Sequence, residues 1–208
     1  MFAGNLLALR QPNIKRILAY SSIAHMGYVM VAFVAGGPAG SAAVAFYLTT
    51  YFLSTVGAFG VVAALSGESE DADSLLAYRG LAWQRPWLAA ALSGMLFSLA
   101  GIPLTAGFVG KFYVLAAGVG TGRWLLAILL VVNSTIGLYY YLRVIVAMYR
   151  SPSPNGDEEP GLGPSRLRGA WSLATALTLS GSSIALVWLG VYPTPLVRIV
   201  QTIAASLT

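Results

Sequence analysis

The feature that most constrains the fold is a long apolar stretch that is interrupted in its middle and carries a lysine. In LFSLAGIPLTAGFVGKFYVLAAGV, Gly101, Pro103 and Gly107 precede Lys111. An ionisable side chain at bilayer depth is costly, so it usually faces a protein interior or a hydrated path. A broken helix at that depth is typical of the ion sites of transporters. We expect a functional lysine here; the structural alternative is a lysine that reaches the interface or pairs with a carbonyl.

Composition indicates the class of protein. Hydrophobic residues make up 57% of the chain and charged residues 9%, against roughly 25% charged residues in soluble domains. The mean hydropathy of +0.75 agrees with a polytopic membrane protein. The basic residues lie at the ends of apolar runs, where they orient helices, so the net charge of +5 does not indicate nucleic-acid binding. The absence of cysteine and the single histidine argue against thiolate chemistry and a multi-histidine metal site.

The apolar runs predict an all-α, polytopic helical membrane protein in which residues 1–208 form a single membrane domain. Residues 67–85 are polar and acidic in their first half, residues 151–168 are expected to be a loop, and neither segment is expected to form a domain of its own. The expected segments are the end of a helix over 1–9, spans over 14–35, 41–65, 87–119 (broken), 124–149 and 170–189, and a surface tail over 192–208.

The distribution of basic residues decides whether the broken segment crosses the membrane once or twice. Two crossings divide the basic residues seven to four between the two sides, whereas one crossing divides them nine to two. Positive loops favour the cytoplasm, so we predict one discontinuous crossing, five complete crossings in all, and two half-helices that meet at IPLTAG. The cytoplasmic set is Arg10, Lys15, Arg16, Arg79, Arg85, Arg143, Arg150, Arg166 and Arg168; Arg123 and Arg198 lie opposite.

Polar side chains recur at helical spacing within the spans and are candidates for the lining of a hydrated path. His25 has an ordinary pKa of about 6.5, which suits proton relay, but a single histidine can equally be a packing residue. Hydroxyls and amides also join membrane helices by hydrogen bonds, and tyrosines form interfacial belts. The path-lining candidates are Ser21, Tyr28, Tyr47, Tyr51, Thr55 and Asn133.

Four blocks in order resemble one known family: NIKRILAYSSIAHMGYVM, FYLTTYFLSTVGAFGVV, FSLAGIPLTAGFVGKFYVL and NSTIGLYYYLRVIVAMY. They are similar to the antiporter-like membrane subunits of the proton-pumping NADH:quinone oxidoreductase, respiratory complex I, and most of all to the C-terminal half of subunit N (subunit 2). The sister subunits tend to carry His or Lys where this chain has Tyr47, Tyr51 and Thr55, and one of them has a glutamate at the position of Lys111.

The resemblance implies a fold, a function and partners. It implies the second of two inverted repeats, in which the broken-helix Lys111, together with His25 and Lys15, forms a proton path along a central polar axis. It implies a non-redox subunit of a translocase in the cell inner (plasma) membrane, with no cofactor in this chain. NADH, flavin, iron–sulfur clusters and quinone belong to partner subunits. The implied partners are other membrane subunits of complex I, the lipid bilayer and the N-terminal half of the same subunit, with no nucleic acid.

The resemblance covers one repeat, so two classes of function remain open. The first is a proton-translocating subunit whose Lys111 alternates between its charged and neutral forms; we expect the positive N-terminal end of its half-helix to act against the ammonium. The second is a non-conducting membrane scaffold or assembly fragment. A subunit of an Mrp-type cation/proton antiporter is a further alternative, but the expected spans contain no Asp or Glu to bind sodium.

Overall fold

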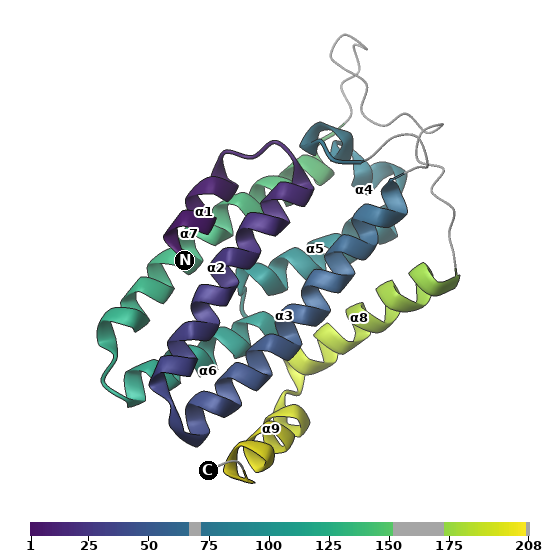
Figure 1. Ribbon diagram of the computed structural model, residues 1–208. Coiled ribbons are helices and arrows are strands. Elements are labelled where there is room, and N and C mark those ends of the chain that lie inside the picture. The colour runs from purple at the N-terminus through teal and green to yellow at the C-terminus, as the bar shows by residue number, and fades with distance from the viewer. Residues whose placement is uncertain (67–71, 152–172, 207–208) are drawn as a thin grey trace.

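The computed structural model describes residues 1–66, 72–151 and 173–206, which form a bundle of helices (Figure 1). The fold is all-α in this part of the chain, as the sequence predicts. In chain order the elements are α1 (Phe2–Leu9), α2 (Ile14–Ala35), α3 (Gly37–Leu65), the 3-10 helix η1 (Leu75–Tyr78), α4 (Leu81–Gln84), α5 (Pro86–Ala100), α6 (Ala106–Gly120), α7 (Trp124–Tyr149), α8 (Leu173–Val191) and α9 (Thr194–Ser206).

Local signals set the start of the long helices. The side chain of Asn13 accepts a hydrogen bond from the backbone N–H of Arg16 at 3.0 Å and caps α2. The turn from α2 to α3 uses Gly36 and Gly37, both with positive φ. Pro38 follows in the first turn of α3, where its missing N–H costs no hydrogen bond. The helix therefore begins at Gly37, four residues before the predicted start of this span.

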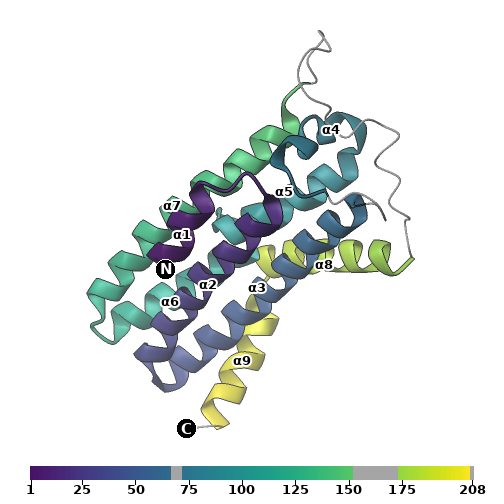
Figure 2. The same ribbon diagram turned by 45° about the horizontal axis from the view of Figure 1, so that its top comes forward.

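Three helices in the described residues, α2, α3 and α7, are each long and apolar enough to cross a membrane. The described parts of α8 and α9 are long and apolar enough to cross a membrane only when they are taken together, and they are bent by 82° relative to each other. Figure 2 shows α9 turning away from α8. α5 and α6 have 15 residues each, too few for one helix to span a bilayer of about 30 Å. The total of five crossings stays a prediction, as does a surface position for 192–208.

The break between α5 and α6 is where the sequence predicts it. Gly101 adopts a left-handed conformation (φ 80°), and the N–H of Ile102 bonds to the carbonyl of Phe97 at 3.1 Å, a Schellman ending of α5. Pro103 follows and cannot continue the helix. The Thr105 side chain accepts from the N–H of Phe108 and caps α6. The expected discontinuous helix is thus confirmed.

The two half-helices together traverse the bundle once. In Figure 1, α5 begins at the end of the molecule where α4 lies, and α6 continues to the opposite end, where it turns into α7. The segment before α4, which holds Arg79, and the turn between α6 and α7, which holds Arg123, therefore lie at opposite ends of the bundle, as the single-crossing interpretation requires. Arg166 and Arg168, two of the nine basic residues assigned to the cytoplasmic side, lie outside the described residues.

The sidedness of these ends can be measured. The chain has no cysteine, so single substitutions Arg79→Cys, Arg123→Cys and Arg166→Cys give unambiguous labelling sites. We expect an impermeant thiol reagent to reach positions 79 and 166 from the cytoplasmic side and position 123 from the outside, because that arrangement gathers the basic loops inside. Labelling of positions 79 and 123 from the same side would contradict the single crossing.

The outer surface of the bundle is apolar. Large exposed hydrophobic side chains occur on every long helix, as expected for surfaces that face lipid tails. Buried apolar residues of α2, α3, α5 and α7 form the main core. Examples on the outside are Met30, Phe33, Phe52, Phe112, Ile128, Val146 and Ile184.

Candidate functional site

Lys111 lies inside the bundle at the helix break. Its side chain is 8% exposed, and its ammonium donates to the carbonyls of Leu99 at 3.0 Å and Ala100 at 2.8 Å. The third proton goes to the hydroxyl of Ser134 on α7 at 2.9 Å. The ammonium also lies 5.3 Å from the centre of the Tyr28 ring, within the range of a cation–π interaction. All three donors of the ammonium are thus satisfied without a carboxylate.

The ending of α5 explains why carbonyls are available to the lysine. The last carbonyls of a helix have no intrahelical partner. Gly101 and Ile102 bond to the carbonyls of Phe97 and Ser98, which leaves those of Leu99 and Ala100 for Lys111. Gly101 also leaves room, because a Cβ there would lie 2.8 Å from Cδ of the lysine.

The helix break gives Lys111 contacts with the C-terminal end of α5 that the sequence analysis did not predict. Side chains on a helix tilt toward its N-terminus, so the lysine, near the start of α6, reaches back across the break. The ammonium there contacts two carbonyls at the C-terminal end of α5, the negative end of that helix dipole. The structural alternative, a lysine paired with a carbonyl, therefore describes its contacts correctly. A role of Lys111 in proton transfer stays a prediction.

His25 is buried on α2 and faces the interior of the bundle, as the sequence predicts. Its Nδ1 lies 2.8 Å from the hydroxyl of Tyr47 on α3, and its Nε2 lies 3.1 Å from the hydroxyl of Tyr141 on α7. The rings of Tyr51 and Tyr28 pack against the imidazole, with centroids at 4.9 and 5.4 Å. Both ring nitrogens have hydroxyl partners, so the geometry permits relay; a role in proton transfer stays a prediction.

A small cavity connects the histidine with the break. Its volume of about 10 Å³ is close to the minimum that can hold one water molecule. Beside it, the hydroxyl of Ser54 on α3 bonds to that of Ser98 on α5 at 2.9 Å. The Oγ of Ser98 in turn accepts from the N–H of Gly107. The lining is His25, Tyr47, Thr50, Tyr51, Ser54, Ser98, Leu99 and Gly107.

Asn5 on α1 joins this polar interior, and the sequence analysis did not single it out. It is fully buried; its amide nitrogen donates to the backbone carbonyl of Asn133 at 2.9 Å and to the Tyr28 hydroxyl at 3.3 Å. The Tyr140 hydroxyl donates to its Oδ1 at 3.0 Å. The signal in the sequence is a single amide side chain within the apolar segment 1–9, which is too short to cross a membrane by itself.

Other candidates have more local roles. Ser21 donates to the carbonyl of Leu18 at 2.7 Å, within its own helix. Thr55 has a buried hydroxyl with no hydrogen-bond partner among the described residues. Pro103 is exposed and acts only as part of the break. The part of the chain that the structure describes holds no group of His, Asp and Glu side chains that could bind a metal ion.

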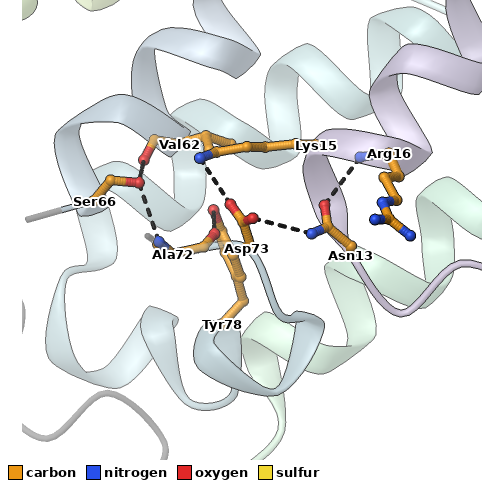
Figure 3. A network of polar contacts seen from close by, with 8 residues as sticks. All are labelled: Asn13, Lys15, Arg16, Val62, Ser66, Ala72, Asp73 and Tyr78. Atoms are coloured by element: carbon orange, nitrogen blue, oxygen red, sulfur yellow. Dashed lines mark hydrogen bonds and ion pairs between the residues drawn. The ribbon is translucent and has the colours of Figure 1, made fainter. Parts of the chain in front are cut away.

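Lys15 is not brought to the Lys111–His25 cluster, although the resemblance placed it on the proton path. It lies at the start of α2, ten residues or about 15 Å along the helix from His25. Its ammonium forms an ion pair with Asp73 at 2.7 Å, as Figure 3 shows. Asn13 donates to the same carboxylate at 3.1 Å. The observed contacts thus give Lys15 a role in holding the segment before η1 against α2.

The Lys15–Asp73 pair predicts a pH dependence of stability. The hydrogen bond from Lys15, assisted by Asn13, holds the pKa of Asp73 below its ordinary value of 3.8. A lowered pKa stabilises the fold above that ordinary value, and the contribution is lost as the pH falls through the lower, folded-state value. Because both side chains are about one-third exposed, we expect no more than about 1 kcal/mol.

The measurement compares the chain with its Asp73→Asn variant by chemical unfolding in detergent. The difference in unfolding free energy is expected to be constant above about pH 5 and to shrink from about pH 4 downward. A difference that grew on acidification would contradict this assignment.

The comparisons with known proteins agree with this geometry. A family model described as "NADH:quinone oxidoreductase/Mrp antiporter, TM" matches residues 1–137. The chain belongs to this family. It is also 48% identical over 204 residues to NADH-quinone oxidoreductase subunit N of Acinetobacter baumannii (strain AB0057). That match covers 96% of the chain and 39% of the relative, and it confirms the resemblance to subunit N that the four sequence blocks predict.

Solved structures of the family share the fold. A chain of respiratory complex I from Thermus thermophilus with bound aureothin is 33% identical, with a TM-score of 0.78 over 95% of this chain and 42% of that one. A chain of the Mrp complex from Dietzia sp. DQ12-45-1b is 24% identical, with a TM-score of 0.82 over 98% of this chain and 44% of that one. The latter shows the fold alone. The protein is therefore a multi-pass membrane member of this family, and it spans about two fifths of the length of these relatives.

Proposed function

We propose that this chain acts as part of a subunit N of a proton-translocating NADH:quinone oxidoreductase, in which Lys111 takes up and releases protons. The observation that carries the proposal is the set of partners around the ammonium: two carbonyls and one hydroxyl, all inside the bundle. The similarity to subunit N supports the choice of complex.

The partners of Lys111 suit both of its protonation states. The ammonium donates one hydrogen bond each to Leu99, Ala100 and Ser134. A neutral amine has two N–H donors and one lone pair, so it can keep both carbonyl bonds while Ser134 reverses and donates its hydroxyl proton. Neither state leaves a buried polar group unsatisfied, which would cost about 1–3 kcal/mol. The site can therefore exchange a proton without rebuilding its surroundings.

His25 supplies the second titratable group. A cavity about the size of one water molecule lies between His25 and the residues of the break, and in this proposal the proton passes from the imidazole toward Lys111 on that side. Redox chemistry has no place in this scheme. NADH, flavin, iron–sulfur clusters and quinone would be held by other subunits in the cell inner membrane, together with the remainder of subunit N.

Ser134→Ala tests the proposal. It removes the one partner that can both accept and donate, so we expect NADH-driven proton transport to fall about tenfold or more, since a hydrogen bond to a charged group is worth about 1.5–3 kcal/mol. The assay uses the assembled oxidoreductase in vesicles, with the N-terminal part of the subunit supplied. Thr135→Ala is the matched control, because the Thr135 hydroxyl bonds only to its own helix, on the exposed face. Unchanged transport by Ser134→Ala would favour the non-conducting scaffold.

A further inference from the structure

An apolar groove lies on the outside of the bundle between α5 and α8. Its volume is about 710 Å³, within the range of about 300–1,000 Å³ that is typical of small-molecule sites. Small residues on both helices leave the space open, and a Cβ on Gly94 of α5 would meet no atom within 4 Å. The buried side chains that form its floor are Leu88, Met95, Leu179 and Leu186. The outer surface therefore has room for a ligand.

The lining of the groove suits hydrocarbon. No charged side chain is among the described residues that line it. Apart from the indole of Trp87, its polar side chains are the hydroxyls of Ser98, Thr105, Ser180 and Ser183. The two at the inner end are used within the protein, because Ser98 accepts from the N–H of Gly107 at 3.1 Å and Thr105 donates to the carbonyl of Ile102 at 2.7 Å. A ligand in the groove is thus held by apolar contact.

The groove has the length of one membrane leaflet. Along α5 it extends from Trp87 to Ser98, eleven residues or about 16 Å of helix. Half of a hydrocarbon core of about 30 Å is about 15 Å. The inner end is closed at the helix break, where a Cβ on Gly190 of α8 would lie 2.5 Å from the carbonyl oxygen of Leu104. A partner helix that crosses the whole membrane cannot follow such a groove, whereas an acyl chain from one leaflet can.

The outer end of the groove has the features of a membrane interface. Trp87 is 83% exposed there, and tryptophan is enriched at the level of the lipid headgroups. Arg85 directly precedes α5 and brings a positive charge to the same end, which attracts a lipid phosphate. The exposed side chains of Ile184 and Val187 line the groove and continue the apolar outer surface of the bundle. An acyl chain can therefore enter from the bilayer without leaving hydrocarbon.

We propose that this groove binds one acyl chain of a phospholipid from the leaflet on the side of α4, with the phosphate near Arg85 and the chain end at the helix break. Ser98 lines both the groove and the small cavity beside His25. The bound chain thus covers the outer side of the wall between the polar interior and the bilayer. Such a site does not depend on proton transfer by Lys111, so it stands or falls separately from the proposed function.

Photolabelling of the full 208-residue chain in phospholipid bilayers tests the site. The probe is phosphatidylcholine with a diazirine at the end of one acyl chain, present as a trace in phosphatidylcholine and phosphatidylglycerol, and mass spectrometry of peptides locates the attached lipid. We expect attachment at Leu104 and Thr105 to exceed that at Ile128 and Val146, which lie exposed on α7 outside the groove. Equal attachment at both places would show ordinary contact with bulk lipid and overturn the proposal.

Gly94→Phe fills the groove from a position with open space around it. Attachment at Leu104 and Thr105 is expected to fall about tenfold, the equivalent of about 1.4 kcal/mol. Gly181→Phe is the matched control, because Gly181 on α8 is equally open but does not line the groove, and attachment should be unchanged. Undiminished attachment in Gly94→Phe would contradict a site in the groove.

The same labelling of the assembled oxidoreductase separates a lipid from a protein occupant. The proposal predicts that attachment at Leu104 and Thr105 persists in the assembled complex. Attachment that is present in the separate chain and absent from the complex would show that a partner subunit covers the groove, and would overturn the lipid assignment.

Discussion

Gly107→Ala is expected to destabilise the fold by about 1–3 kcal/mol, although it adds only a methyl group. A Cβ at this position overlaps the backbone carbonyl of Ser98, which cannot move without shifting the end of α5. The N–H of Gly107 also donates to the hydroxyl of Ser98 at 3.1 Å and would be displaced. The ordinary helical preference for alanine over glycine, about 0.5–1 kcal/mol, is too small to offset this overlap.

The matched control for this prediction is Gly94→Ala in α5. A Cβ there meets no atom within 4 Å, so the substitution is expected to leave stability unchanged or to raise it slightly. Unfolding in detergent, followed by tryptophan fluorescence, measures both variants. Equal stabilities of the two variants would show that the half-helices are not held at the close approach described here.

Lys111→Arg is expected to abolish proton transport through this subunit, even though it keeps the positive charge. Guanidinium does not release its proton in the physiological pH range, so residue 111 would have no neutral form to which Ser134 could donate a hydrogen bond. Its planar fork also needs more space than the ammonium, beside Gly101, where a Cβ would already lie 3.1 Å from Nζ. The measurement is NADH-driven acidification of vesicles that contain the assembled oxidoreductase.

Arg123→Ala is the control for loss of a cation that takes no part in the polar network, since Arg123 is exposed in the turn between α6 and α7. The complex with Arg123→Ala should acidify the vesicles at the unsubstituted rate. Normal pumping by Lys111→Arg, at an equal amount of assembled complex, would show that release of a proton from residue 111 is unnecessary.

The broken helix was predictable because its signals are local. Glycine at a left-handed position, a following proline and a capping threonine dictate the ending of one helix and the start of the next, whatever surrounds them. The position of His25 on an interior face follows from helical spacing with Ser21 and Tyr28. These inferences need only the order of residues along one segment.

The contacts of the site could not be predicted, because they depend on how separate segments pack. The sequence placed Lys111 beside the positive end of α6, but the side chain reaches the free carbonyls of α5. Lys15 was assigned to the proton path through resemblance, and its contact with Asp73 appears only when the loop before η1 packs on α2. The part that Asn5 takes in the buried polar cluster depends on its hydrogen bonds to α2 and α7, which the sequence of α1 does not reveal.

The central claim, that protons pass through Lys111, is tested most directly by the rate of NADH-driven proton transport by the Lys111→Ala complex. The complex carries this chain together with the N-terminal part of the subunit, and the rate is divided by the amount of assembled complex in the vesicles. The account predicts near-normal assembly, because the remaining carbonyls of Leu99 and Ala100 can bind water in the space left by the lysine, and a large fall in transport. Transport at the unsubstituted rate by a correctly assembled Lys111→Ala complex would contradict it.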